Sequence, residues 1–187
     1  MSYIMQRYII HLDNKGFKIN DAKNLLNKAR SLSLKGSIIR DARVAHTHIE
    51  FDVSIEREKI KELLKHLEEI SPLKRCIEIN EKNLEKDEAI RYARELFNEE
   101  RYWECHEVLE CVWKNSKNDE KYTIQGIILI AAAFVHIQKE EIEIAYNIFK
   151  RAIPKLRLDR YRGIEVVKLR EIIDEIITNK KIIYFKI

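Results

Sequence analysis

The chain has 187 residues, of which 45% are hydrophobic and 35% are charged, and it contains only 4 glycines and 2 prolines. This composition predicts a folded protein built from long regular elements and argues against an intrinsically disordered chain. The net charge of +4 is below the charge density of a dedicated nucleic-acid-binding domain.

The first 80 residues alternate between strand and helix patterns. The clearest strand is at 48–55, where Ile49, Phe51, Val53 and Ile55 alternate with polar residues, so one face should be buried and the other wet. In chain order we predict a strand at 3–12, a helix from about 21 to 34, strands at 37–44 and 48–55, a helix at 56–70 and a strand at 73–79. This order is typical of a ferredoxin-like βαββαβ module, which we assign to residues 1–82.

The hydrophobic period changes from 2 to 3.6 near residue 87, which predicts a second, helical domain over residues 83–187. The fold class is therefore α+β, with a ferredoxin-like module followed by an all-α bundle of about five helices. We expect these helices at 87–99, 102–115, 121–138, 140–156 and 165–178. Residues 181–187 are rich in isoleucine and aromatic side chains and predict a C-terminal strand that pairs with an edge of the N-terminal sheet.

Several features predict a soluble cytoplasmic protein. The three cysteines, Cys76, Cys105 and Cys111, are an odd number without a CxxC pair, which is typical of reduced intracellular thiols. The N-terminus lacks a signal-peptide pattern, and the nearly uncharged stretch 122–138 is shorter than the roughly 20 apolar residues of a membrane span. The abundance of Ile, Lys and Glu is typical of proteins from thermophiles.

The helix predicted at 102–115 carries an unusual polar stripe. Tyr102, His106, Glu110 and Trp113 share one face at spacings of 4, 4 and 3, with Glu107 beside them. The next helix carries Gln125 and His136 on one face, and an antiparallel pairing of the two helices would set Glu110 level with Gln125.

This pair of helices resembles the domain of unknown function 309 family, which has an HE-x-x-E-x-x-W helix followed by a helix with Q-G, small alanines and H-x-Q. The resemblance covers about residues 87–175 and implies no activity, because none is established for the family. The matching positions are Tyr102, His106, Glu107, Glu110, Trp113, Gln125, Gly126, Ala132, His136 and Gln138.

Three functions remain open from the sequence. The first is a non-catalytic binding or interaction protein, whose partner is another protein or a second copy of the chain. In that case the His/Glu/Gln cluster is a polar network with Glu110 buried and neutralised by His106, or a ligand pocket, and no cofactor is expected. The second is a metal-assisted hydrolase that binds a divalent metal through His106, Glu110 and His136, with Glu107 or Glu110 as general base.

The third is a nucleic-acid-associated accessory protein. Basic residues cluster near the end of the chain, and a phosphate contact there is the alternative to a solvated helix end. The residues of this candidate anion contact are Lys155, Arg157, Arg160 and Arg162.

Overall fold

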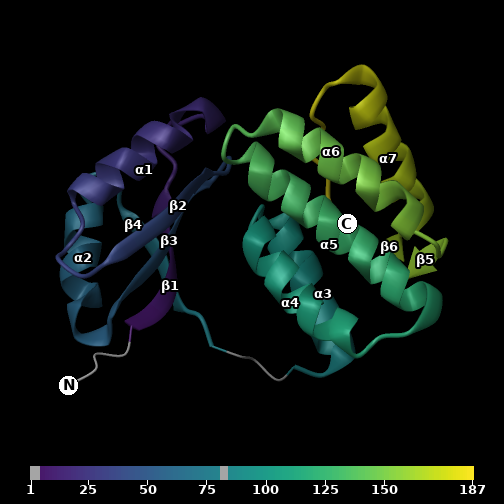
Figure 1. The fold of residues 1–187 in the computed structure, drawn as a ribbon, viewed down its shortest axis with the longest axis horizontal. Helices are drawn as coiled ribbons and strands as arrows, with labels where there is room; N and C mark the ends of the chain where they lie inside the picture. Colours follow the sequence, from purple (N-terminus) through teal and green to yellow (C-terminus); the bar gives the residue numbers. More distant parts are fainter. Residues whose placement is uncertain (1–4, 81–83) are drawn as a thin grey trace. The chain divides into compact units, whose positions relative to one another are not determined.

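In the computed structural model, residues 5–80 and 84–187 are described. The chain folds into two compact units (Figure 1). The sheet unit comprises residues 1–82 together with 138–140, and the helical unit comprises residues 83–137 and 141–187. Residues 138–140 belong to the sheet unit because the Val44 amide donates to the Gln138 carbonyl at 2.9 Å. The predicted boundary between residues 82 and 83 lies outside the described residues.

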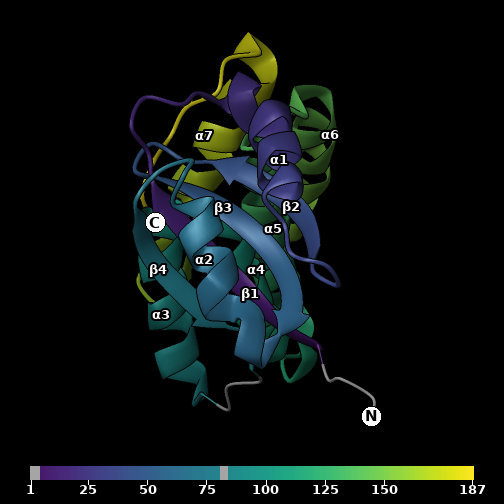
Figure 2. The ribbon, with the colours of Figure 1, turned by 90° about the vertical axis from the view of Figure 1, so that its left-hand side faces the viewer.

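The sheet unit has one four-stranded antiparallel sheet with strand order β2-β3-β1-β4. Helices α1 and α2 both cover one face of this sheet (Figures 1 and 2). All six elements predicted for this part of the chain are present, although Tyr3 and Ile4 of the first predicted strand lie outside the described residues. The elements are β1 (Met5–Asp13), α1 (Ala22–Ser31), β2 (Ile38–Val44), β3 (His48–Glu56), α2 (Ile60–Leu67) and β4 (Leu73–Glu78).

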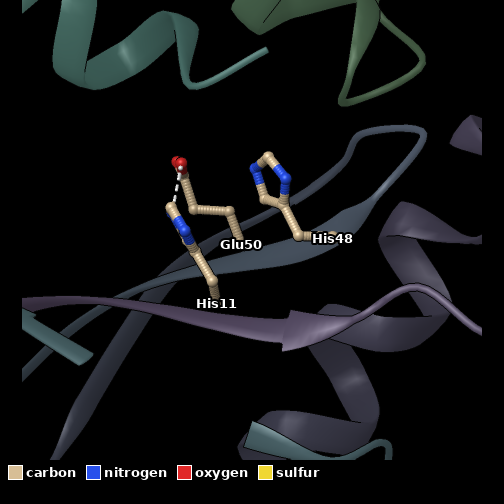
Figure 3. A group of neighbouring side chains, drawn as sticks. All are labelled: His11, His48 and Glu50. Carbon is tan, nitrogen blue, oxygen red and sulfur yellow. Dashed lines mark hydrogen bonds and ion pairs between the residues drawn. The ribbon is translucent and has the colours of Figure 1, made fainter. Parts of the chain in front are cut away.

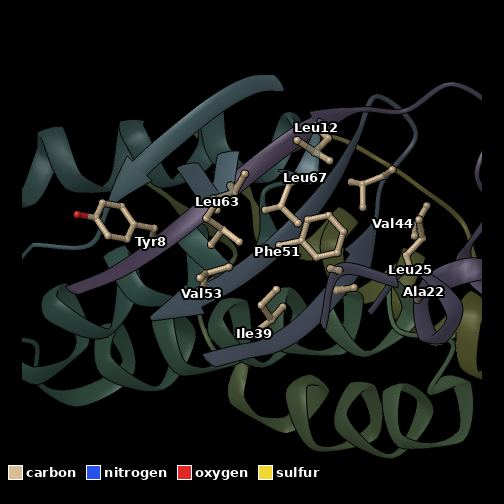
Figure 4. Close-up of a cluster of buried hydrophobic side chains, with 14 of the residues drawn as sticks. Tyr8, Leu12, Ala22, Leu25, Ile39, Val44, Phe51, Val53, Leu63 and Leu67 are labelled. Atoms are coloured by element: carbon tan, nitrogen blue, oxygen red, sulfur yellow. The ribbon is translucent and has the colours of Figure 1, made fainter. Parts of the chain in front are cut away.

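The apolar core lies between the sheet and these two helices (Figure 4). Phe51 and Val53 of β3 are fully buried, and so are Leu63 and Leu67 of α2. Leu25 of α1 belongs to the same core. The alternation in β3 therefore points its odd-numbered residues into the core, as predicted.

The opposite face of the sheet is polar but is not exposed to solvent. The prediction that the second face of β3 is solvated is therefore wrong. Glu50, Asp52 and Ser54 are all buried, with 2%, 2% and 5% of their surface exposed. Their charges and hydroxyl are satisfied by arginines of the neighbouring strands β1 and β2. Arg7 binds Asp52, Arg43 binds Glu50, and Arg40 donates to Ser54 at 2.6 Å. Cross-strand pairing replaces the water that the alternating pattern had led us to expect.

The helical unit contains the predicted helices and one short addition. The addition is a short hairpin whose two strands, β5 (Arg160–Tyr161) and β6 (Ile164–Glu165), have two residues each. The turn between them contains Gly163, whose φ of +84° is a conformation that favours glycine. The helices are α3 (Lys86–Asn98), α4 (Tyr102–Lys114), α5 (Asn118–Ile137), α6 (Ile142–Ala152) and α7 (Val166–Asn179).

Helix α5 is the core helix of this unit. Its length and composition alone would let it cross a membrane, but 56% of its most apolar 18-residue stretch is buried inside the protein. Phe134 is fully buried and contacts the rings of Phe97, Tyr102 and Phe149 at centroid distances of 4.7–5.8 Å. The apolar character of α5 is therefore explained by its neighbours α3, α4 and α6.

The C-terminal strand predicted at 181–187 is wrong. These residues form neither strand nor helix and do not join the sheet. The Ile187 amide donates to Oδ1 of Asn98 at 2.8 Å, and the Asn98 side chain donates back to the Ile187 carbonyl at 3.2 Å. Phe185 packs against Phe97 and Phe134. Side chains of the helical unit thus hold both backbone groups of Ile187 and the ring of Phe185, where a strand partner had been predicted.

Candidate metal centre

Three ligand-type side chains gather on the polar face of the sheet (Figure 3). His48 and Glu50 are two residues apart on β3, so the pleat points both side chains to the same face. His11 of β1 is the residue directly opposite Glu50 in the antiparallel register. Pairing of the two central strands therefore fixes all three positions through backbone hydrogen bonds. We call His11, His48 and Glu50 the sheet triad.

The sheet triad has distances suited to one shared ion. One ligand atom from each residue lies within 4.8 Å of the other two. Nε2 of His11 lies 3.1 Å from Oε2 of Glu50, and the two imidazole ring centroids are 4.4 Å apart. The three residues are only 2–5% exposed. An ion bound here would replace the hydrogen bond between His11 and Glu50.

Arginines set the charge of Glu50 and of its neighbour Asp52. Burial by itself raises the pKa of Glu50, but the Arg43 guanidinium and the hydrogen bond from His11 outweigh it and lower the pKa to about 2. Glu50 is therefore a carboxylate throughout the physiological range. Nη1 of Arg43 binds Oε1, which leaves Oε2 directed at His11.

Asp52 is held separately and stays out of the triad. Arg7 donates to both of its oxygens, at 2.9 and 2.6 Å, and Nη2 of Arg43 lies 3.6 Å from Oδ2. The fork of Arg7 matches the carboxylate, which is the geometry that gives strong bidentate pairs. The polar face thus offers one carboxylate oxygen and two imidazoles to an ion, with the arginines fixing the orientation of the carboxylate from outside.

The stripe predicted on α4 has a different character. Nε2 of His106 lies 3.4 Å from Glu110, and Nδ1 lies 3.4 Å from Glu107. Both glutamate side chains are 44% exposed, so the expectation that Glu110 is a buried carboxylate is wrong. No hydrogen bond joins Glu110 to Gln125 within the described residues. His106, Glu107 and Glu110 of this stripe therefore form a surface cluster whose two carboxylates are open to water.

The structure does not assemble the alternative metal set of His106, Glu110 and His136. Nδ1 of His136 instead lies 2.5 Å from Oε2 of Glu141, just beyond the end of α5. Over residues 5–80 and 84–187, the sheet triad is the group of three that meets the ligand distances. Tyr102 is a core residue whose ring stacks on Phe134 at 4.7 Å. Trp113 is half-buried, with the Lys121 ammonium 4.6 Å from its ring centroid.

The arginines of the candidate anion contact form ion pairs with different acidic residues. Arg160 binds Glu165 at 2.8 Å, and Arg162 binds Asp87. Arg157 lies 3.2 Å from Asp119 and also covers the ring of Tyr122, as does Lys155. Within the described residues, the three arginines therefore contact separate acidic partners, and Lys155 and Arg157 share the ring of Tyr122.

Residues 90–148 match the family model described as Domain of unknown function (DUF309). This confirms the resemblance, over a shorter range than predicted. Within the helical unit, residues 90–148 are therefore similar to the DUF309 family. The chain is also similar to an uncharacterised protein of Aquifex aeolicus, with 29% identity over 98 residues that cover 51% of this chain. The chain spans only 29% of the length of that relative.

The structure gives a packing reason for one residue of the matched motif, Gly126. Gly126 faces Leu156, and a Cβ atom at position 126 would lie 2.6 Å from Cδ2 of that leucine. Glycine therefore allows the segment after α6 to lie against α5. The match does not include His11, His48 or Glu50, so the family carries no information about the sheet triad.

Two groups of buried polar residues were not predicted from the sequence. The H-x-E pattern of residues 48–50 was visible, but its meaning depends on the β1–β3 register, which places His11 opposite Glu50. The second is a buried pair in the DUF309 region, where Arg101 donates to both oxygens of Glu104 at 2.8 and 2.5 Å. Their spacing of three on a helix start was a signal that could have been used.

Proposed function

We propose that this protein is a non-catalytic metal-binding protein, whose sheet unit holds a divalent transition-metal ion through the sheet triad. The observation that carries the proposal is the convergence of His11, His48 and Glu50 within 4.8 Å on one face of the sheet. Two imidazoles and one carboxylate are a ligand set used for zinc, and imidazole also suits copper, nickel and iron.

The charge balance favours transition metals over calcium and magnesium. Calcium needs six to eight oxygen ligands, and magnesium needs an octahedral set of oxygens. The polar face has only two central carboxylates, Glu50 and Asp52, and arginines already bind both. Imidazole nitrogens therefore supply most of the affinity. The orientation of Glu50 by Arg43 is the kind of outer contact that prepares a metal ligand.

A binding role fits these surroundings better than catalysis. Each ligand is buried, and the ligands come from the two central strands of the sheet. An ion here would join β1 to β3 and stabilise the sheet unit, as structural metal sites do.

The strand order β2-β3-β1-β4 with both helices on one face supports the finer assignment of this unit as ferredoxin-like.

Metal analysis of the protein tests the proposal. The full chain is purified without chelator and without a nickel column, its metal content is measured by mass spectrometry, and zinc is then titrated calorimetrically. We expect one ion per chain, lost in His11→Ala and in His48→Ala. His66→Ala is the matched control, because His66 lies on α2 and contacts the Leu32 carbonyl at 3.0 Å. No zinc binding by the wild type, or equal loss in the control, would contradict the proposal.

A further inference from the structure

The segment that follows α6 is fixed against α5 by two contacts. Leu156 fills the space that the missing side chain of Gly126 leaves open. The hydroxyl of Thr123, which is fully buried, accepts hydrogen bonds from the amides of Arg157 and Leu158 at 3.2 and 3.1 Å. Residues 156–158 are therefore held on α5 by one side-chain contact and two backbone hydrogen bonds.

This anchoring sets two cations on one exposed aromatic ring. Cζ of Arg157 lies 3.5 Å from the ring centroid of Tyr122, and Nζ of Lys155 lies 5.2 Å from it. Tyr122 is 37% exposed, and the Arg157 side chain is 45% exposed. The residue before Tyr122, Lys121, covers the ring of Trp113 in turn. The Tyr122 surface, as we name it, consists of Trp113, Lys121, Tyr122, Lys155 and Arg157.

We propose that the Tyr122 surface binds single-stranded nucleic acid. A guanidinium backed by an aromatic ring keeps its outer side open, and unpaired bases stack on such planes as they do on aromatic rings. The ammonium groups of Lys155, over the Tyr122 ring, and of Lys121, over the Trp113 ring, supply positive charge for phosphates. Aromatic rings between cations are the arrangement that sequence-tolerant single-strand binding uses. The site is independent of the sheet triad.

The same contacts argue against two other anionic partners. A phosphopeptide site needs an arginine fork directed at one phosphate, whereas Arg157 lies against a ring and gives Nη1 to Asp119 at 3.2 Å. A membrane surface needs a broad apolar face beside the cations. Asp119, 61% exposed, opposes any phosphate that approaches Arg157. Its removal should therefore tighten binding.

Fluorescence anisotropy with labelled oligouridine and oligothymidine of about 12 nucleotides tests the proposal. The full chain is used in EDTA, so that the result does not depend on a metal ion. We expect binding at about 50 mM salt that weakens steeply towards about 200 mM. Tyr122→Leu should weaken binding by about 5- to 100-fold through lost stacking. Arg157→Gln should weaken it and reduce the salt slope by about 1.

Two further variants separate this site from general charge effects. Arg160→Gln removes the same charge from a residue that is 77% exposed and paired with Glu165, and should leave affinity nearly unchanged. Asp119→Asn should tighten binding, a gain that misfolding cannot produce. The proposal is overturned if the wild type does not bind at low salt, or if Arg157→Gln and Arg160→Gln act alike. It is also overturned if polyphosphate binds equally well and Tyr122→Leu changes nothing.

Discussion

Arg43 on β2 and Glu50 on β3 form an ion pair in which each side chain is only 2% exposed. The pair lies beside His11, which contacts the other carboxylate oxygen of Glu50. Arg43 thus has two effects: it neutralises a buried charge, and it directs Oε2 of Glu50 towards the imidazoles. Stability and metal binding in the sheet unit should therefore both depend on this contact.

Replacing Arg43 with methionine should lower the free energy of unfolding by about 3–5 kcal/mol, because it leaves a buried carboxylate without its partner. Urea denaturation monitored by circular dichroism measures the loss. Arg57→Met is the control, because Arg57 is 74% exposed and lies 3.7 Å from Glu78, a surface pair worth about 0–1 kcal/mol. Equal losses in the two variants would show that the Arg43 pair contributes no more than a surface contact.

Stability should also depend on pH through Glu50. Its pKa falls from 4.5 to about 2 in the folded protein, so its contribution is complete above pH 4.5 and is lost as the pH falls towards 2. The difference of 2.5 between those two values corresponds to about 3 kcal/mol. Unfolding of the wild type and of Glu50→Gln should therefore be compared between these limits. If both lose stability equally over that range, Glu50 is not the group responsible.

Zinc should stabilise the sheet unit if the triad binds it. A ligand that binds only the folded state at about 100 times its dissociation constant adds roughly 2.7 kcal/mol to the free energy of unfolding. We expect this gain for the wild type and for His66→Ala, and its absence for His48→Ala and after addition of EDTA. Magnesium at the same concentration should have no effect. A gain that persists in His48→Ala would place the ion elsewhere.

The sequence predicted regular elements well where local pattern and packing agree. The predicted helix at 102–115 corresponds to α4 at Tyr102–Lys114, and the predicted strand at 73–79 to β4 at Leu73–Glu78. The C-terminal segment shows the opposite case. Its composition favours a strand, but Asn98 binds both backbone groups of Ile187. A side chain distant in sequence thus holds the end of this segment, and composition carries no record of that contact.

The candidate site could not be predicted for a related reason. Alternation in β3 identified the core residues, and it also assigned Glu50 and Asp52 to water. Their charges are instead paired with Arg7 and Arg43, which come from two different strands. The cluster on α4 was conspicuous because its spacing is local, whereas His11 lies 39 residues from Glu50. Site chemistry that depends on strand register is visible only after the register is known.

Gly126→Ala tests whether the close approach of Leu156 anchors the Tyr122 surface. A Cβ atom at position 126 would lie 2.6 Å from Cδ2 of Leu156 and 3.2 Å from its backbone nitrogen, so side-chain rotation relieves only part of the overlap. Overpacking costs about 1–3 kcal/mol, which outweighs the gain of about 1 kcal/mol in helix propensity. We expect a net loss of roughly 1 kcal/mol and weaker oligonucleotide binding, because residues 155–158 must move.

The sign of this effect should reverse when Leu156 is shortened. In a Leu156→Ala background, the overlap is largely removed and the new methyl group fills part of the cavity. Gly126→Ala should then stabilise the protein by about 1 kcal/mol, through helix propensity and recovered packing. Thermal and urea unfolding of the four proteins in this double-mutant cycle measure the coupling. Additive effects would mean that Gly126 and Leu156 do not constrain each other, and that Thr123 alone holds the segment on α5.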